Sequence, residues 1–294
     1  MGAGNRPRRA WPLCDRENSR PTAQGFWPHQ SRRPAPALHR GRALPDGVAE
    51  SEPERFDDEG PQHPVTLSAG FWLADTACTQ ALWEAVIGNS PSHFNAKNRG
   101  GPQHPVEQVS WDDVQGFLRA LENRLPGVIA SLPSEAEWEY ACRAGTLTAF
   151  SFGDQVTPGQ VNYNGHHPYA GGSKGLYRES TVPVRSLPAN AWGLYEMHGN
   201  VWEWCADGKR EYAGRDETDP RGQEGEGVAA RALRGGSFYG SAGLARSADR
   251  SGVAPGSAIR DCGFRFALRS TSPAAVTERP APRDAAHNGV SRQR

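Results

Sequence analysis

Cysteine and histidine are the side chains best suited to hold a metal or to act as nucleophiles, and this chain has five of the first and nine of the second. The cysteines are odd in number and scattered, without a CxxC pair, and no two histidines form an HxxxH pair. His166 and His167 adjoin, but neighbouring histidines in a glycine-rich loop are more often solvated than bound to metal. The spacing therefore predicts no zinc-type site and indicates a chain with reduced thiols.

Capping residues and apolar spacing predict three helices that can position polar side chains. Thr79 and Ser110 each precede apolar residues at helical spacing, and Gly88 ends the first run. Ser134 and Glu137 have the spacing of a capping box and are followed by apolar residues at core spacing. The predicted helices cover residues 79–88, 110–125 and 134–144.

Short apolar runs predict strands at residues 63–67 and 71–73, which we expect to pair as a hairpin, and at 233–238 and 264–268. Strands and helices do not alternate along the chain. The sequence therefore predicts an α+β domain with mixed, mostly antiparallel sheets, few helices and long ordered loops. The chain has nine tryptophans, and aromatics this dense usually pack a scaffold. We assign to the core Trp138, Trp192, Trp202 and Trp204.

Composition divides the 294 residues into one folded domain and two tails. The first 45 residues hold nine arginines and no lysine, without the apolar core of a secretory signal, which indicates a disordered tail or a mis-assigned translation start. The end of the chain is rich in Ala, Pro, Arg and Ser and is equally unable to bury a core. We place the tails at 1–53 and 269–294 and the domain at 54–268.

The charge of the chain limits its partners. A formal net charge of zero and a pI near 7.1 argue against nucleic acid, because such binding depends on a basic field. No apolar run approaches the roughly 20 residues of a bilayer span. With no targeting segment visible, we expect a cytoplasmic protein without a membrane span.

Six motifs resemble one family in their order along the chain. They are EGPQHPV at 59–65, HPV at 104–106, VSW at 109–111, LPSEAEWE at 132–139, GLYEMHGNVWEW at 193–204 and RGGS at 234–237. Together they make residues 54–268 similar to the formylglycine-generating enzymes, also called sulfatase-modifying factors. The resemblance implies a variant of the C-type lectin fold. One departure is LPDG at 44–47, which replaces the family's usual opening strand.

The resemblance implies an oxidase that uses copper and dioxygen to convert a substrate cysteine to formylglycine. The family's enzymes hold copper with two cysteines, at the third and eighth positions after the serine of RGGS, and soft thiolates suit Cu(I). Counted from Ser237, these positions are Gly240 and Ala245. Neither side chain can bind a metal, so we expect no copper site and no catalytic residue. Cys262, the one cysteine among residues 238–262, leaves a rebuilt copper site open as a minor alternative.

The 238–262 segment also resembles the randomised cassette of variable proteins from diversity-generating retroelements. Randomised template adenines cannot produce Lys, Glu, Gln, Met or Trp from Asn codons, and the segment contains none of these five. The alternative is an ordinary surface loop of a decayed enzyme. If the segment is a binding surface, we expect the ligand to contact Tyr239, Gly240, Ser241, Leu244, Asp249, Ser251, Val253, Gly256, Ile259 and Asp261.

The resemblance further implies calcium at two places. One site uses the side chains of Glu196 and Glu203 with the carbonyls of Gly199 and Val201, and calcium prefers six to eight oxygens. The alternative is that both carboxylates cap or form ion pairs within a tight loop. A second site uses the Asn162 side chain and the Tyr163 carbonyl, but Leu176 stands where the family has an acidic ligand.

These observations leave competing functions. The leading hypothesis is a non-catalytic ligand-binding protein on this scaffold, a retroelement variable protein whose partner is an unknown macromolecule or cell-surface group. The alternative is a formylglycine-generating oxidase or a related protein-modifying oxidoreductase. A third hypothesis is a regulatory or effector module, which would act through partners because no kinase or nucleotide motif is visible.

Overall fold

The computed structural model describes residues 43–225 and 227–271. This part of the chain has three α-helices: α1 (Gln80–Ile87), α2 (Trp111–Glu122) and α3 (Glu135–Arg143). Its strands are β1 (Ala43–Asp46), β2 (His63–Thr66), β3 (Trp72–Leu73), β4 (Val128–Ser131), β5 (Trp202–Trp204), β6 (Glu217–Thr218), β7 (Arg231–Arg234), β8 (Arg250–Val253), β9 (Cys262–Gly263) and β10 (Ala267–Ser270). Most of the other described residues lie in loops, as predicted.

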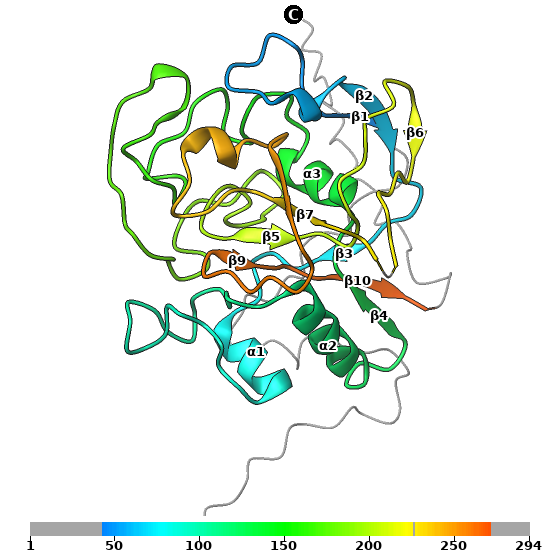
Figure 1. Ribbon diagram of the computed structural model, residues 1–294, viewed down its shortest axis with the longest axis vertical. Helices are drawn as coiled ribbons and strands as arrows, with labels where there is room; N and C mark the ends of the chain where they lie inside the picture. Colours follow the sequence, from blue (N-terminus) through cyan, green and yellow to red (C-terminus); the bar gives the residue numbers. More distant parts are fainter. Residues whose placement is uncertain (1–42, 226, 272–294) are drawn as a thin grey trace, which may run out of the picture.

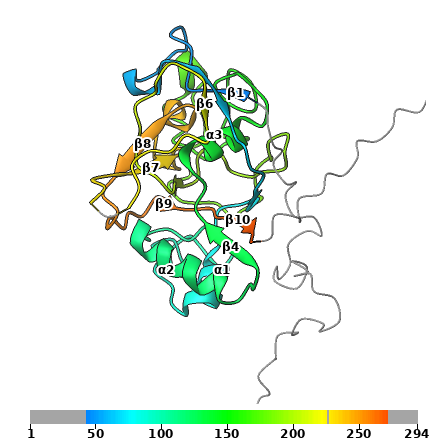
Figure 2. The same ribbon diagram turned by 90° about the vertical axis from the view of Figure 1, so that its right-hand side faces the viewer.

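The strands form three small sheets, ordered β1-β2-β6, β3-β10-β4 and β8-β7-β5-β9. Five of their seven pairings are antiparallel, and only β2–β6 and β5–β9 are parallel among the described strands. Figures 1 and 2 both place α1 and α2 on one side of the central strands and α3 on the other. This arrangement confirms the predicted α+β class.

The predicted helix ends are confirmed by their caps. Thr79 Oγ1 accepts the Leu82 amide at 3.2 Å, and Gly88 ends α1 with a left-handed φ of 88°. Ser110 and Ser134 each form a capping box at the start of α2 and α3. Helix α2 ends at Glu122, before the predicted residue 125, because the Arg124 and Leu125 amides bond back only three residues and tighten the turn.

The predicted strands are partly wrong in pairing and position. β2 and β3 do not form a hairpin, because β2 pairs with β1 and β6 while β3 pairs with β10. The short segment between β2 and β3 therefore carries the chain from one sheet to another. β7 begins before residue 233 and ends at Arg234, since Gly235 and Gly236 leave the strand with φ values of 92° and 70°.

The folded domain extends beyond both predicted boundaries. β1 begins at Ala43, ahead of residue 54, and pairs along its whole length with β2 although it lacks the family's usual opening pattern. β10 likewise continues past residue 268 to Ser270. The other predicted tail residues, 1–42 and 272–294, lie outside the described part of the chain. Within the described ranges, no helix has the length and apolar character needed to cross a membrane.

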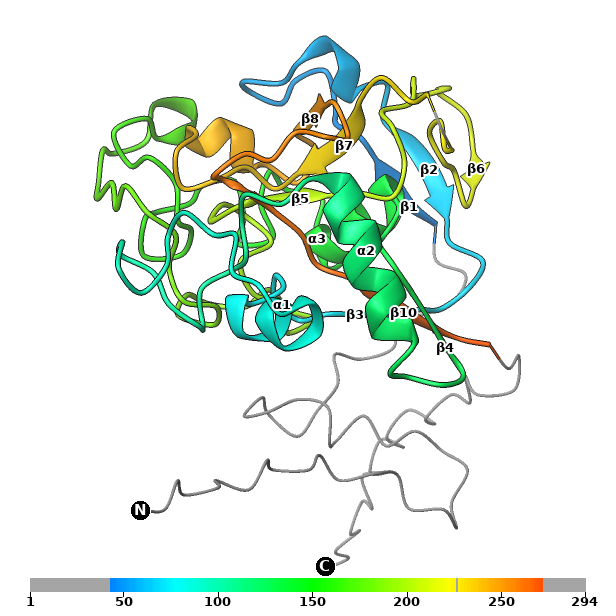
Figure 3. The same cartoon turned by 60° about the horizontal axis from the view of Figure 1, so that its bottom comes forward.

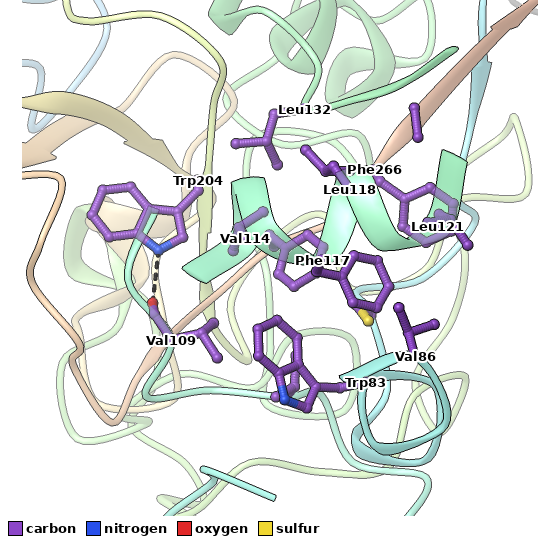
Figure 4. Close-up of a cluster of buried hydrophobic side chains, with 14 of the residues drawn as sticks. Trp83, Val86, Val109, Val114, Phe117, Leu118, Leu121, Leu132, Trp204 and Phe266 are labelled. Atoms are coloured by element: carbon purple, nitrogen blue, oxygen red, sulfur yellow. Dashed lines mark hydrogen bonds between the residues drawn. The ribbon is translucent and has the colours of Figure 1, made fainter. Parts of the chain in front are cut away.

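The largest core cluster lies between α1, α2 and the central strands (Figure 4). Phe117 of α2 stacks on Trp83 of α1 with ring centroids 5.4 Å apart. Trp204 is fully buried and donates its indole N–H to the Val109 carbonyl at 3.0 Å. All four assigned tryptophans lie in or against core clusters, as predicted.

Candidate ligand-binding site

The 238–262 segment leaves β7 through two glycines that the fold requires. A Cβ on Gly235 would lie 3.0 Å from the Met197 carbonyl oxygen, and one on Gly236 would lie 2.7 Å from the Leu244 carbonyl oxygen. The chain then forms a short 3-10 turn, η4 (Ala242–Ala245). Figure 3 shows η4 beside the long loops around residues 150–180, and the Asn164 amide bonds to the Gly240 carbonyl at 2.9 Å.

Buried arginines hold this segment on the scaffold. Arg234 pairs with Glu139 of α3 and donates to the Ala248 carbonyl at 2.9 Å. Arg250 makes two bonds to Glu135, at 2.6 and 2.7 Å. Paired charge-assisted bonds of this kind fix the backbone geometry of the segment. The loop is therefore ordered before any ligand arrives.

A pocket of about 280 Å³ opens beside the start of the segment. Residues from three parts of the chain form what we call the Tyr239 pocket: His93, Phe94, Asn98, Arg99, Tyr177, Glu179, Phe238, Tyr239 and Arg260. Phe94 and Phe238 are buried and meet edge to face with centroids 5.1 Å apart. Tyr239 is 58% exposed, and the Arg260 guanidinium lies 5.7 Å from its ring centroid. The pocket thus has an apolar floor and a charged rim.

Of the ten predicted ligand contacts, only Tyr239 lines this pocket. Asp261 is half-buried nearby and accepts the Ser237 hydroxyl at 2.7 Å. Val253 and Ile259 are half-buried and pack against the main core cluster. The remaining half-buried or exposed predicted residues are Gly240, Ser241, Leu244, Ser251 and Gly256, and the structure does not gather them in the pocket.

The prediction that Asp249 contacts a ligand is wrong, because this residue is buried. Its side chain is 1% exposed and lies 3.8 Å from Arg246 inside the scaffold. Burial first, and then the nearby Glu59 carboxylate, raise the pKa of Asp249 to about 8. A ligand cannot reach this side chain, so Asp249 acts on the fold and not on recognition.

The two positions that the resemblance assigns to copper carry no donor side chain here. Ala245 is fully buried in η4, and Gly240 is half-buried before it. Cys262 lies in β9 as part of the main core cluster, and burial raises the pKa of its thiol far above the usual range. All four described cysteines are buried and unpaired. The contacts therefore argue against Cys262 as a rebuilt copper ligand.

One thiol does approach an imidazole. Cys142 Sγ lies 3.7 Å from both ring nitrogens of His198. The sulfur is therefore not directed at the lone pair of one nitrogen. His198 Nδ1 donates to the Ala245 carbonyl at 2.7 Å, and Nε2 accepts the Ser151 amide at 3.0 Å. Burial raises the pKa of Cys142 to about 12 and lowers that of His198 to about 4. The pair is a neutral packing contact without the thiolate that metal binding needs.

In the predicted calcium loop, the contacts of Glu196 and Glu203 fit the alternative interpretation better, in which the two carboxylates cap the loop or form ion pairs. Both Glu203 oxygens accept Arg265, at 2.6 and 2.8 Å, and one also accepts the Trp138 indole at 2.7 Å. Glu196 accepts two backbone amides, and burial raises its pKa to about 7. The carboxylates are thus engaged by the protein, with Gly199 and Val201 between them. Calcium at this loop stays a prediction, and these contacts count against it.

The second predicted calcium site is incomplete in its donors. Asn162 Oδ1 is buried without a hydrogen-bond partner among the described residues, which suits a cation ligand. Leu176, however, is 60% exposed and brings no oxygen from its side chain. Tyr163 is fully buried beside Asn162. Across the described ranges, no three His, Cys, Asp or Glu side chains are grouped to hold a metal ion.

Most residues of the Tyr239 pocket are not among the contacts predicted from the sequence. His93 and Arg99 come from the loop after α1, and Tyr177 comes from a loop far along the chain. Arg260 lies in the 238–262 segment but is not among the predicted contacts. Only the aromatic character of Tyr239 pointed to a contact residue. A single sequence carries no local signal that brings such loops together.

The loop-rich α+β domain with its few helices and small mixed sheets has a C-type lectin-like fold of the formylglycine-generating type. The chain belongs to the corresponding family, because residues 31–270 match the sulfatase-modifying factor enzyme 1-like domain.

Known proteins support this assignment. A formylglycine-generating enzyme of Streptomyces coelicolor is 35% identical over 230 residues, 74% of this chain and 70% of that protein. Treponema denticola variable protein 1 superposes with a TM-score of 0.64 at 28% identity, covering 77% and 92% of the two chains. PvdO from Pseudomonas aeruginosa superposes with a TM-score of 0.66 at 25% identity, and the match covers 81% of this chain and 99% of PvdO. The chain spans 24% to 65% of the length of further curated relatives that it matches.

Proposed function

We propose that this protein binds a ligand without catalysis, with the Tyr239 pocket and the adjoining 238–262 segment as its recognition surface. The observation that carries the proposal is the pair Gly240 and Ala245 at the positions the family uses for copper. Cys262 offers no substitute, because it is buried in the core. Without thiolates the segment has no means to hold Cu(I) and activate dioxygen.

The support beneath the segment favours recognition. Arg234, Arg246 and Arg250 are buried, and they bind carboxylates from two other parts of the fold, helix α3 and the loop before β2. A loop held in this way loses little conformational entropy when a ligand binds. We propose that the protein is a variable protein of the retroelement type and that its ligand belongs to a macromolecule or cell surface. Its likeness to Treponema denticola variable protein 1 favours this version.

The second candidate is a formylglycine-generating oxidase, favoured by identity to relatives that carry that name. An assay of peptide-cysteine oxidation with copper and oxygen separates the two candidates. We expect no formylglycine by mass spectrometry from the copper-treated protein under conditions where an active relative turns over. Catalytic turnover would overturn the binding proposal.

The variable-protein version has a separate test in the neighbouring DNA. We expect a reverse transcriptase gene and an adenine-rich template repeat matching the 238–262 segment. Their absence would remove this version and leave a binding module with an inherited ligand.

A further inference from the structure

The floor of the Tyr239 pocket is aromatic. Phe94 follows α1 and is 4% exposed, while Phe238 follows β7 and is 2% exposed. The two rings meet edge to face at 87° and both line the pocket, as do Tyr177 and Tyr239. Aromatic rings pack on one another with centroids about 4.5–7 Å apart. At about 280 Å³ the space suits a single ring with a short substituent.

The rim carries excess positive charge. Arg99 and Glu179 form one ion pair at 3.2 Å, with side chains 60% and 59% exposed. Exposed pairs of this kind contribute little, so Arg99 can exchange its partner. Arg260 contacts the Tyr239 ring, but no carboxylate within the described part of the chain lies at ion-pair distance from it. The lining therefore holds two guanidiniums against one carboxylate.

We propose that the Tyr239 pocket binds an aromatic ring that bears a carboxylate, an inference that rests on the proposed binding function. The ring lies on Phe94 and Phe238, and the carboxylate takes paired hydrogen bonds from the Arg260 guanidinium at the rim. Guanidinium forks match carboxylates in geometry and charge. Such a group is found in a free aromatic acid or in the C-terminal aromatic residue of a peptide.

The rim also discriminates against other charges. A cationic ring meets the unpaired Arg260 guanidinium, and like charges brought together weaken binding. Burial first, and then the nearby Tyr239 and Glu179, raise the pKa of Tyr177, so its phenol stays protonated and can donate to an anion. A neutral aromatic ligand can still pack on Phe94 and Phe238, but it lacks the carboxylate that would accept charge-assisted hydrogen bonds from Arg260.

The test compares phenylpropanoate, its neutral amide and phenylethylammonium by titration calorimetry on the whole chain. The amide has one acceptor oxygen where the carboxylate has two, so it loses one charge-assisted hydrogen bond. We therefore expect the anion to bind about tenfold more tightly than the amide, and the cation to bind weakest. Comparison with a short peptide that ends in phenylalanine, as acid and as amide, distinguishes the two ligand sources. Equal binding of the anion and the amide would overturn the inference.

Variants assign the effect to residues. Arg260→Gln should reduce the preference for the anion to within about twofold. Arg119→Gln, a matched change at an exposed arginine of α2 outside the pocket, should leave that preference intact. An unchanged preference in Arg260→Gln would refute the role of Arg260. If no probe binds and the oxidation assay is negative, this inference is wrong but the proposed function stands. Turnover in the oxidation assay would instead contradict the proposed function.

Discussion

Replacing Arg265 by methionine is expected to lower the free energy of unfolding by ~3–5 kcal/mol, because it leaves a buried carboxylate without its counter-charge. Arg265 is fully buried, and its two bonds to Glu203 join β5 to the chain between β9 and β10. It also donates to the carbonyls of Ala74 and Tyr195. Chemical denaturation monitored by tryptophan fluorescence measures the loss.

A double variant separates the uncompensated charge from lost packing. Glu203→Gln with Arg265→Met removes both charges but keeps an amide oxygen to accept the Trp138 indole. We expect it to be more stable than Arg265→Met alone, because no charge then stays buried and unpaired. Arg119→Met, an exposed control, should change stability by about 0.5 kcal/mol or less. An Arg265→Met protein as stable as that control would contradict the assigned role.

Replacing Arg246 by methionine is expected to have a comparable effect, ~3–5 kcal/mol, at the base of the recognition segment. Arg246 binds both oxygens of Glu59 at 2.6 Å, and Glu59 has no exposed surface. It also reaches Glu52 at 2.9 Å and the Glu54 carbonyl at 2.9 Å. The variant should both unfold at lower denaturant concentration and release the loop before β2.

Hydrogen exchange provides the local measurement. The Val48 amide bonds to the Glu59 carbonyl at 3.0 Å, so its protection should fall in Arg246→Met. Arg246→Lys keeps the charge but loses the paired geometry, and we expect an intermediate loss of stability. Unchanged protection at Val48 in the methionine variant would mean that Arg246 does not hold this loop.

The helices were predictable because their signals are local. Ser110 and Ser134 bond to amides three residues ahead, and Gly88 adopts the left-handed conformation that glycine favours. The strands were harder to predict, since β3 pairs with β10 from the far end of the chain. Nothing in two or four residues of strand sequence specifies so distant a partner.

The binding surface was predicted only in part for a related reason. The residue type and position of Tyr239 correctly predict a residue that lines the pocket, but the prediction of Asp249 at the surface is wrong, because it is buried beside Arg246. Beside it Arg246 binds Glu59, which lies far away in the sequence. The pocket likewise needs Arg99 and Tyr177 from separate loops. Residue type predicts what a side chain can do, and long-range packing decides whether a ligand can reach it.

Gly240 and Ala245 stand where the family's enzymes have two copper-binding cysteines. A Cβ at Gly240 would lie 3.2 Å from the flexible end of Leu244, so a cysteine there needs only a small side-chain shift. Ala245 differs from cysteine by a single sulfur atom. The double variant Gly240→Cys with Ala245→Cys is therefore a fair positive control for copper binding.

Competition of the whole chain against a chromophoric Cu(I) chelator is the decisive titration. The wild-type protein should remove no stoichiometric Cu(I) from the chelator, because its four described thiols are buried and protonated. The double-cysteine variant should bind one equivalent. One tightly held Cu(I) in the wild-type protein, lost on Cys262→Ser, would contradict binding without catalysis and favour an oxidase.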